Sequence, residues 1–297
     1  MNTLTVLIKR NTKMFFKDKG LLFTSLITPL ILLVLYATFL SNVYKDSFMM
    51  SIPEFVEVEE SLINACVGGQ LLSSLLAVCC VTVAFCSNML MIQDKVTGTR
   101  KDLLITPVSP STLALSYYIA TMFVTLIICF IAIVAGMAYL ACIGWYLRFA
   151  DILLIFLDVF ILVLFGTSIS SIVNCFLSSQ GQISAVGSIV SAGYGFICGA
   201  YMPISSFGDG LQKVVSFLPG TYGTSLLRNH ALGGVFEEMS AQGFPSEVIT
   251  GIKDSIDCNL YFFGDKVQSW VGYLVLGVSV AVLIGAYVLI HKCRKDK

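Results

Sequence analysis

Six long apolar stretches follow one another along the chain, separated by shorter polar segments. They cover residues 20–42, 62–91, 111–143, 152–177, 183–202 and 269–290. A helix needs about 20 apolar residues to cross the hydrocarbon core of a bilayer. Apolar and polar residues do not alternate here as they would in the strands of a membrane β-barrel. The pattern therefore predicts an all-α membrane protein, with six transmembrane helices in a single domain over residues 1–297.

Composition and charge support this interpretation and give an orientation. Apolar residues make up 57% of the 297, and charged residues only 12%, which is about half their usual share in a soluble protein. Of the 18 Lys and Arg residues, 12 lie in residues 1–19, in residues 92–110 and in the tail after residue 290. Short cytoplasmic loops carry the excess of Lys and Arg. We therefore expect both termini in the cytoplasm and the chain in a bacterial plasma membrane.

Residues 1–19 read as a basic amphipathic helix, with no cleavable signal peptide because the apolar run that follows is too long. Its apolar face would hold Leu4, Leu7, Ile8, Asn11 and Phe15, and its basic face Lys9, Arg10, Lys13 and Lys17. Such a helix lies in the headgroup plane of the bilayer, with its lysines toward anionic lipid. The alternative is a solvated run of lysines.

The loop at 92–110 predicts a short helix beneath the membrane. Thr99 and Asp102 resemble a capping box, which favours a helix starting near Arg100, and Pro107 and Pro110 would end it. The alternative is an ordinary cytoplasmic loop.

Motifs for common enzymes and binding proteins are absent from the sequence. It has no phosphate-binding P-loop, no H-E-x-x-H, no G-x-S-x-G and no CxxC pair, and its two histidines are expected on opposite sides of the membrane. The basic residues lie at membrane borders, which does not indicate nucleic-acid binding. We expect no enzymatic activity, cofactor or metal ion on this chain, and no disulfide framework, with Cys258 as the one clear thiol in an outside loop.

The 92–110 loop also resembles a known family. Asp94-Lys95, Gly98-Thr99, Leu103-Leu104 and Thr106-Pro107-Val108 resemble the signature loop of ABC-2-type export permeases, although the family's first acid is usually glutamate and its second is replaced here by Val96 or Thr97. The resemblance implies a six-span permease of the type V fold. It also implies a coupling helix in this loop, and a separate nucleotide-binding subunit that binds ATP and Mg. The residues expected to couple to that ATPase are Asp94, Lys95, Gly98, Thr99, Arg100, Lys101, Asp102 and Pro107.

The resemblance extends over most of the chain. Residues 1–19 resemble the family's connecting helix, while 217–222 and 226–228 resemble its Leu-Pro-x-x-Tyr and Leu-Arg segment. The family places a re-entrant hairpin near residues 203–218, within an extracellular region that would here cover 203–268. The residues expected to form an extracellular gate are Phe207, Leu211, Pro219, Tyr222 and Arg228.

Two further features within the spans have alternative interpretations. Gly187, Ser191, Gly195 and Gly199 recur every four residues, which allows close helix packing in lipid, either within the chain or against a second permease chain, identical or paralogous. Asp158 and Asn174 are polar residues in the fourth stretch. Because a lone carboxylate in a span should face protein or water, Asp158 either contacts a neighbouring helix or lines a pathway.

The sequence therefore predicts the membrane subunit of an ATP-driven exporter that moves a drug, peptide, lipid or glycan outward by alternating access. One alternative is a sensor subunit that does not transport, in which the outside segment 203–268 binds a peptide and the ATPase only signals. A less favoured alternative is a membrane enzyme, which would require convergent reactive groups at the lipid interface.

Overall fold

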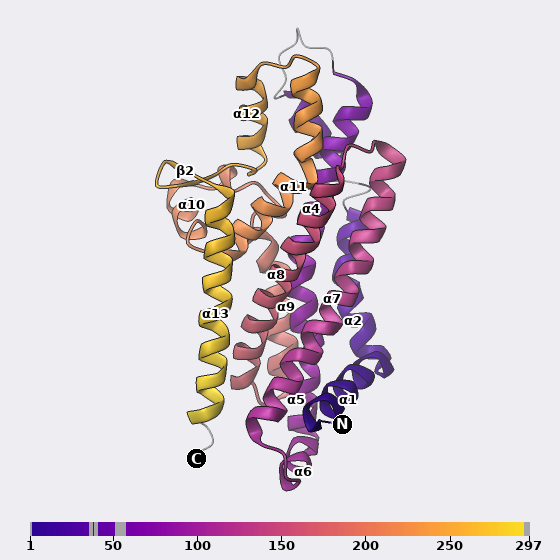
Figure 1. The fold of residues 1–297 in the computed structure, drawn as a ribbon, viewed down its shortest axis with the longest axis vertical. Coiled ribbons are helices and arrows are strands. Elements are labelled where there is room, and N and C mark those ends of the chain that lie inside the picture. The colour runs from indigo at the N-terminus through magenta and orange to yellow at the C-terminus, as the bar shows by residue number, and fades with distance from the viewer. Residues whose placement is uncertain (1, 36–37, 39–40, 51–57, 294–297) are drawn as a thin grey trace.

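Long helices run side by side along the long axis of the molecule (Figure 1). This computed structural model describes residues 2–35, 38, 41–50 and 58–293. Its helices are α1 (Thr3–Lys17), α2 (Lys19–Leu35), α3 (Ser41–Met50), α4 (Glu60–Ser87), α5 (Met89–Val96), α6 (Thr99–Ile105), α7 (Pro110–Ile143), α8 (Phe149–Phe176), α9 (Gln180–Ile197), the 3-10 turn η2 (Ile204–Ser206), α10 (Asp209–Val215), α11 (Pro219–Ala241), α12 (Ser246–Ser255) and α13 (Ser269–Cys293). Strands β1 (Leu260–Phe262) and β2 (Asp265–Val267) form one antiparallel hairpin.

Within the described residues, four helical segments are long and apolar enough to cross a membrane: Glu60–Val96, Pro110–Ile143, Phe149–Phe176 and Ser269–Ile290. The bent pair α1–α2 makes a fifth if it counts as one span. The expected stretch at 20–42 extends past α2 into residues that are partly outside the described ones. These spans confirm a helical membrane protein.

The fifth expected span, 183–202, was predicted to extend further at its carboxyl end than the helix does. It forms α9, which ends at Ile197 because the chain turns at Gly199, where φ is 74°. Glycine adopts this left-handed conformation without steric cost. Helix α9 is not among the segments apolar enough to cross a membrane by composition, since serine, glycine and glutamine residues interrupt it.

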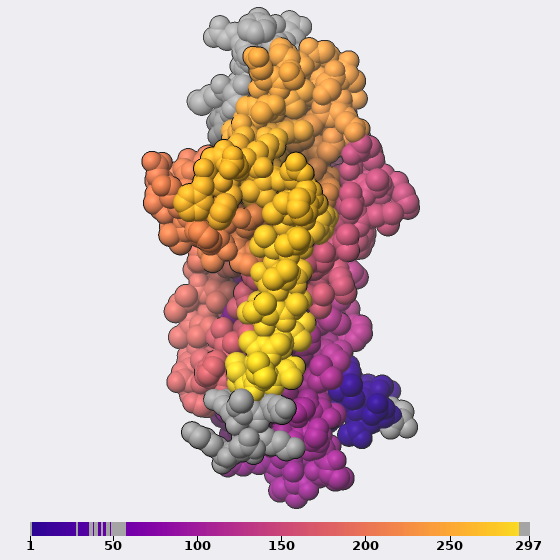
Figure 2. Space-filling model, turned by 60° about the vertical axis from the view of Figure 1, so that its left-hand side comes forward, coloured from indigo at the N-terminus to yellow at the C-terminus, as the bar shows by residue number. Residues whose placement is uncertain are grey.

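Helix α4 is the centre of the bundle, and α2, α7, α8, α9 and α11 all pack against it. It is buried from Leu62 to Ser87 with few gaps. Small residues allow the close contacts: a Cβ on Gly166 of α8 would lie 2.6 Å from the carbonyl oxygen of Cys80 in α4. Helix α13 is exposed where α4 is buried: only 17% of its apolar segment is buried, and it runs along the surface in Figure 2. An apolar helix exposed in this way suits contact with lipid.

The two ends of the bundle differ. Helices α1 and α6 lie at one end, which we call the α6 end, and α12 lies at the other, the α12 end (Figure 1). The region expected to be extracellular, 203–268, is ordered into η2, α10, α11, α12 and the hairpin. The hairpin loop is Phe263-Gly264, with φ of 51° and 99°, which fits the two-residue turn that matches strand twist.

Candidate functional site

The loop with the family resemblance forms the exposed helix α6 at the α6 end. None of its residues is buried, and Ile105 is 85% exposed. The expected capping box of Thr99 with Asp102 is wrong: Gly98 is the N-cap residue, and the Thr99 hydroxyl lies 3.0 Å from that of Thr97. Gly98 has a φ of 84°, a value that favours glycine, so this residue decides where α6 begins.

The other surface residues expected to couple to an ATPase lie on or beside α6. Lys101 and Asp102 are exposed, while Arg100 is half-buried. Pro107 is exposed just beyond the helix, and Thr106 before it is extended with ψ of 162°, as the steric effect of proline on its neighbour requires. The α6 end therefore presents charged and apolar side chains together.

Asp94 lies inside the protein and not on this surface. It is 3% exposed. Arg10 donates to both carboxylate oxygens, from Nη1 to Oδ2 at 2.6 Å and from Nη2 to Oδ1 at 3.2 Å, and the Tyr117 hydroxyl donates to Oδ2 at 2.6 Å. A guanidinium that contacts both carboxylate oxygens sets the relative orientation of the two groups in addition to pairing their charges. This ion pair therefore ties α5 to α1 and α7.

Arg10 does not lie on an exposed basic face of α1 as expected, because its side chain is only 24% exposed. A buried carboxylate needs a counter-ion, and Asp94 draws Arg10 away from the headgroup side. The opposite face of α1 is buried at Leu7, Asn11 and Phe15. The Asn11 amide donates to the Ser116 hydroxyl of α7 at 3.1 Å.

Lys95 makes the second internal connection of α5. Its ammonium donates to the carbonyl oxygen of Leu177 at 2.5 Å. Leu177 is the C-cap residue of α8, where a cation is favourable because the last carbonyl groups of a helix lack partners. Two neighbouring residues of α5 thus contact α1 on one side and the turn between α8 and α9 on the other.

Between these connected elements lies a groove with a volume of about 440 Å³. It is bounded by α2, the junction of α4 with α5, and α9. Helix α9 contributes Gln180, Ser184, Gly187, Ser188 and Ser191 to the groove. Polar and small side chains therefore face an opening along a helix of an otherwise apolar bundle.

The small-residue ladder of α9 divides between two environments. A Cβ on Gly195 would lie 2.3 Å from the ring of Tyr201, whose hydroxyl donates to the Ser191 carbonyl at 3.3 Å. Gly195 and Gly199 are both buried within the chain, so at these two positions the packing is intramolecular. Gly187, which is also buried and lies against Met89, and the half-buried Ser191 both line the groove, so this is the part of the ladder that borders an opening.

The two polar residues of α8 that were expected near a pathway both have partners. Asp158 accepts from the Tyr273 hydroxyl at 2.6 Å and lies 2.5 Å from Nδ1 of His230, so it joins α8 to α13 and α11. The Asn174 amide donates to the Asn88 carbonyl at 3.4 Å. Asp158 therefore contacts neighbouring helices, as the first of the two interpretations requires.

Arg228 does not lie at an opening. It is 1% exposed, and its guanidinium contacts Asp257 at 3.2 Å, the Ser74 hydroxyl at 3.3 Å and the Gly199 carbonyl. Asp257 also accepts from the backbone N–H of Ile204 at 2.7 Å. Burial raises the pKa of the Asp257 carboxyl, although Arg228 opposes that shift. Arg228 is therefore not placed at a gate as expected. It forms a buried ion pair that joins α11 to α4, to the turn after α9 and to the segment after α12.

The other expected gate residues differ in exposure. Leu211 is 51% exposed and Phe207 is half-buried. Pro219 is the first residue of α11. Tyr222 is buried, and its hydroxyl donates to the Ser216 carbonyl at 2.8 Å.

Sequence reasoning missed the partners of three buried acids that pair across elements: Arg10 and Tyr117 for Asp94, His230 and Tyr273 for Asp158, and Arg228 for Asp257. The ionisable character of each residue was visible, but no local spacing links them. Among the described residues, no cluster of His, Cys, Asp and Glu could hold a metal ion. The described cysteines other than Cys293 are free thiols, and Cys258 is buried.

Comparison with known proteins gives one result that covers most of the chain. The sequence model of the ABC-2 type transporter family matches residues 2–231, which include α1, the exposed helix α6, both sides of the groove and Arg228. A comparison with curated proteins gives no match. The family match covers well over half of the sequence. The chain therefore belongs to the ABC-2 type transporter family and is a membrane permease component of an ABC transporter.

Proposed function

We propose that this chain is the permease subunit of an ATP-driven exporter in a bacterial plasma membrane. A separate ATPase, which holds ATP and Mg, would dock on α6. The observation that carries the proposal is the pair of contacts made by adjacent residues of α5. Asp94 is bonded to α1 and Lys95 to the turn after α8, so a push on α6 reaches both sides of the groove.

The α6 end is the cytoplasmic side in this proposal. The N-terminus, α6 and the end of α13 lie at the same end of the bundle (Figure 1), and the basic segments 1–19 and 92–110 belong to it. The positive-inside rule favours the cytoplasm for such an end. The α12 end is then outside the cell.

Movement would pass from α6 to the groove by two routes. The first runs through Asp94 and Arg10 to α1, which continues into α2 after Asp18. The second runs through Lys95 to Leu177 and into α9. Since α2 and α9 form the two sides of the groove, displacing them changes its width, as alternating access requires.

A second permease chain would face the groove. The exposed face of α9 carries Ser184, Ser188 and Gln180, which are poor neighbours for lipid tails. Polar groups in a membrane instead face protein or a water-filled path. The groove of one chain and that of its partner, identical or paralogous, would together enclose the pathway for a drug, peptide, lipid or glycan.

The proposal is tested by reversing the charges of α6 in a complex with its ATPase. Arg100→Glu, Lys101→Glu and Asp102→Lys together should lower ATP turnover stimulated by the permease, with membrane insertion intact. The matched control is Asp265→Lys with Lys266→Glu in the hairpin, at the opposite end of the chain's fold. Unchanged turnover in the α6 variant would remove the coupling role.

Cross-linking tests the proposed interface. Cysteine at Ser188 should form dimers on oxidation in membranes, while cysteine at Val278, exposed on α13, should form none above the background of the parent chain. Equal yields at the two sites would place the second chain elsewhere.

A further inference from the structure

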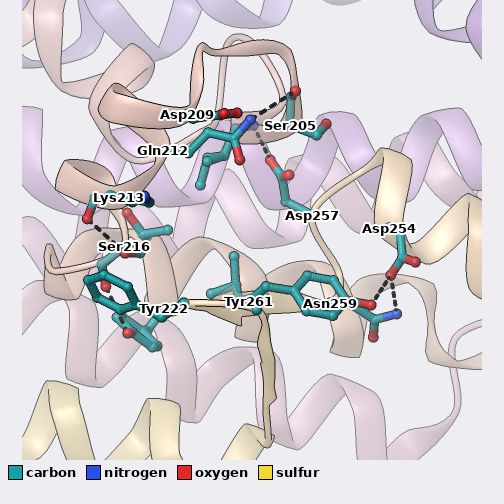
Figure 3. Close-up of a pocket in the computed structure, with 15 residues that line it drawn as sticks. Ser205, Asp209, Gln212, Lys213, Ser216, Tyr222, Asp254, Asp257, Asn259 and Tyr261 are labelled. Carbon is teal, nitrogen blue, oxygen red and sulfur yellow. Dashed lines mark hydrogen bonds between the residues drawn. The ribbon is translucent and has the colours of Figure 1, made fainter.

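A second opening lies toward the α12 end and shares no lining residue with the groove. It is a cavity of about 500 Å³ between η2, α10, α11, α12 and the hairpin. Figure 3 shows acidic and aromatic side chains from these elements around one space. We call it the outer cavity. The transport path proposed above does not use it.

The charges that line the outer cavity are unequal. Three carboxylates, Asp209, Asp254 and Asp257, face one ammonium, Lys213. The Arg228 ion pair behind the cavity neutralises Asp257. Asp209 and Asp254 then remain as two negative charges, opposed by the one positive charge of Lys213. None of these three side chains forms an ion pair with the described residues. The lining side chains and Arg228 together therefore carry one net negative charge.

Asp254 has one carboxylate oxygen that can accept a further hydrogen bond. The Asn259 amide donates to its Oδ1 at 2.7 Å, and the Tyr261 hydroxyl donates to the same oxygen at 3.0 Å. The other oxygen, Oδ2, has no hydrogen bond within the described part of the chain. The hydrogen bond to Asp254 raises the pKa of Tyr261, and the Tyr261 hydroxyl holds the carboxylate in place beside the ring.

The aromatic lining includes a residue held in a strained conformation. Phe263 has a φ of 51° and is 64% exposed, at a turn position that usually takes Asn or Gly. Such a conformation costs about 1 kcal/mol or more and often marks a functional site. The ring stacks edge-on against Phe262, with centroids 4.9 Å apart, and lies 5.9 Å from Phe217. The hairpin thus holds an apolar ring at the edge of the cavity.

Acidic and aromatic groups together select a cation with an apolar part. Carboxylates attract an ammonium group, and the faces of Tyr and Phe rings stabilise one within about 6 Å of the ring centre. Lys213 lies toward the opposite side of the view from Asp254, with Tyr261 between them (Figure 3). The end of the cavity at Asp254 is therefore the more negative one.

We propose that the outer cavity binds an organic cation, with its ammonium group at Asp254 and Tyr261 and its apolar part against Phe263 and Leu260. The hairpin leads directly into α13, whose second residue, Trp270, is 62% exposed. Tryptophan is enriched at membrane interfaces. The ligand would therefore reach the cavity from the outer surface of the membrane.

The test uses the purified full chain in lipid nanodiscs, without any ATPase, and two soluble probes of similar size. Isothermal titration calorimetry should detect benzyltrimethylammonium binding to the parent protein and no binding of benzenesulfonate. Asp254→Asn should weaken the cation by about fivefold, which corresponds to losing a contact of about 1 kcal/mol. Tyr261→Leu should weaken it by about two- to fivefold for the same reason.

Two further variants separate charge from misfolding. Lys213→Gln removes the opposing charge and should strengthen cation binding, a gain that a damaged fold cannot produce. Asp265→Asn removes the same charge as Asp254→Asn, but from a residue of strand β2 that does not line the cavity, and should leave binding unchanged.

The proposal is overturned if the anion binds as well as the cation. It is also overturned if Lys213→Gln and Asp254→Asn change affinity in the same direction. Since no ATPase is present, either outcome leaves the transport proposal untouched. Loss of coupling in the α6 variant would likewise leave cation binding intact.

Discussion

The contact between Arg10 and Asp94 gives the sharpest quantitative prediction, because its two partners differ in exposure. The Asp94 side chain is 4% exposed and the Arg10 side chain 24%. Removing one partner of a buried ion pair costs about 3–5 kcal/mol when the other charge stays buried. Replacing each residue by its neutral analogue, Arg10→Gln and Asp94→Asn, should therefore have unequal effects.

The expected magnitudes follow from what each variant leaves behind. Arg10→Gln leaves a buried carboxylate with the Tyr117 hydroxyl as its strong donor, so it should lower the free energy of unfolding by about 3 kcal/mol. Asp94→Asn leaves a guanidinium that can reach water, which limits the loss to about 1 kcal/mol. The double variant should lose less than the sum of the two, because neither unpaired charge remains.

Unfolding in detergent micelles, followed by circular dichroism, measures these differences. The control is Lys9→Gln, an exposed residue of the same helix, which should change stability by less than about 0.5 kcal/mol. Equal losses in the two single variants, or a double variant that is strictly additive, would refute the account of a buried carboxylate held by a partly solvated guanidinium.

Two further predictions concern helix packing and the second ion pair. Gly195→Ala should destabilise by about 1–3 kcal/mol because its Cβ would meet a tyrosine ring at 2.3 Å. Gly193→Ala, with nothing within 4 Å, should stabilise by up to about 1 kcal/mol; the same sign for both in thermal unfolding would contradict this packing. Arg228→Met should cost about 3–5 kcal/mol because it leaves Asp257 buried without its counter-ion. Lys45→Met, whose partner Glu60 has a side chain that is 76% exposed, should cost clearly less, and equal losses in the same assay would argue against a buried pair.

Much of the fold could be predicted from local pattern. The expected stretch 111–143 corresponds to α7 at Pro110–Ile143, and 152–177 to α8 at Phe149–Phe176. The loop at 92–110 does contain a helix, α6. It starts at Thr99, close to the expected start near Arg100, but the N-cap residue is Gly98 and the expected capping box does not form.

The candidate site was predicted only in part. Asp94 and Lys95 are adjacent and both were expected to face an ATPase, yet they contact residues 84 and 82 positions away. Arg228 was expected at a gate and instead pairs with Asp257. The error has one cause: the position of a charge along the chain does not tell which other charge reaches it in space.

The sequence by itself determined that the chain is helical and membrane-embedded, where its helices lie, and that a short polar helix joins two of them. These properties depend on hydropathy over about 20 neighbouring residues and on the thickness of the bilayer. Only the tertiary structure decided which buried charges are paired, which glycines face inward and where a groove and a cavity remain. Those depend on packing between helices distant in sequence, where a buried charge is tolerated only if a partner from another helix reaches it.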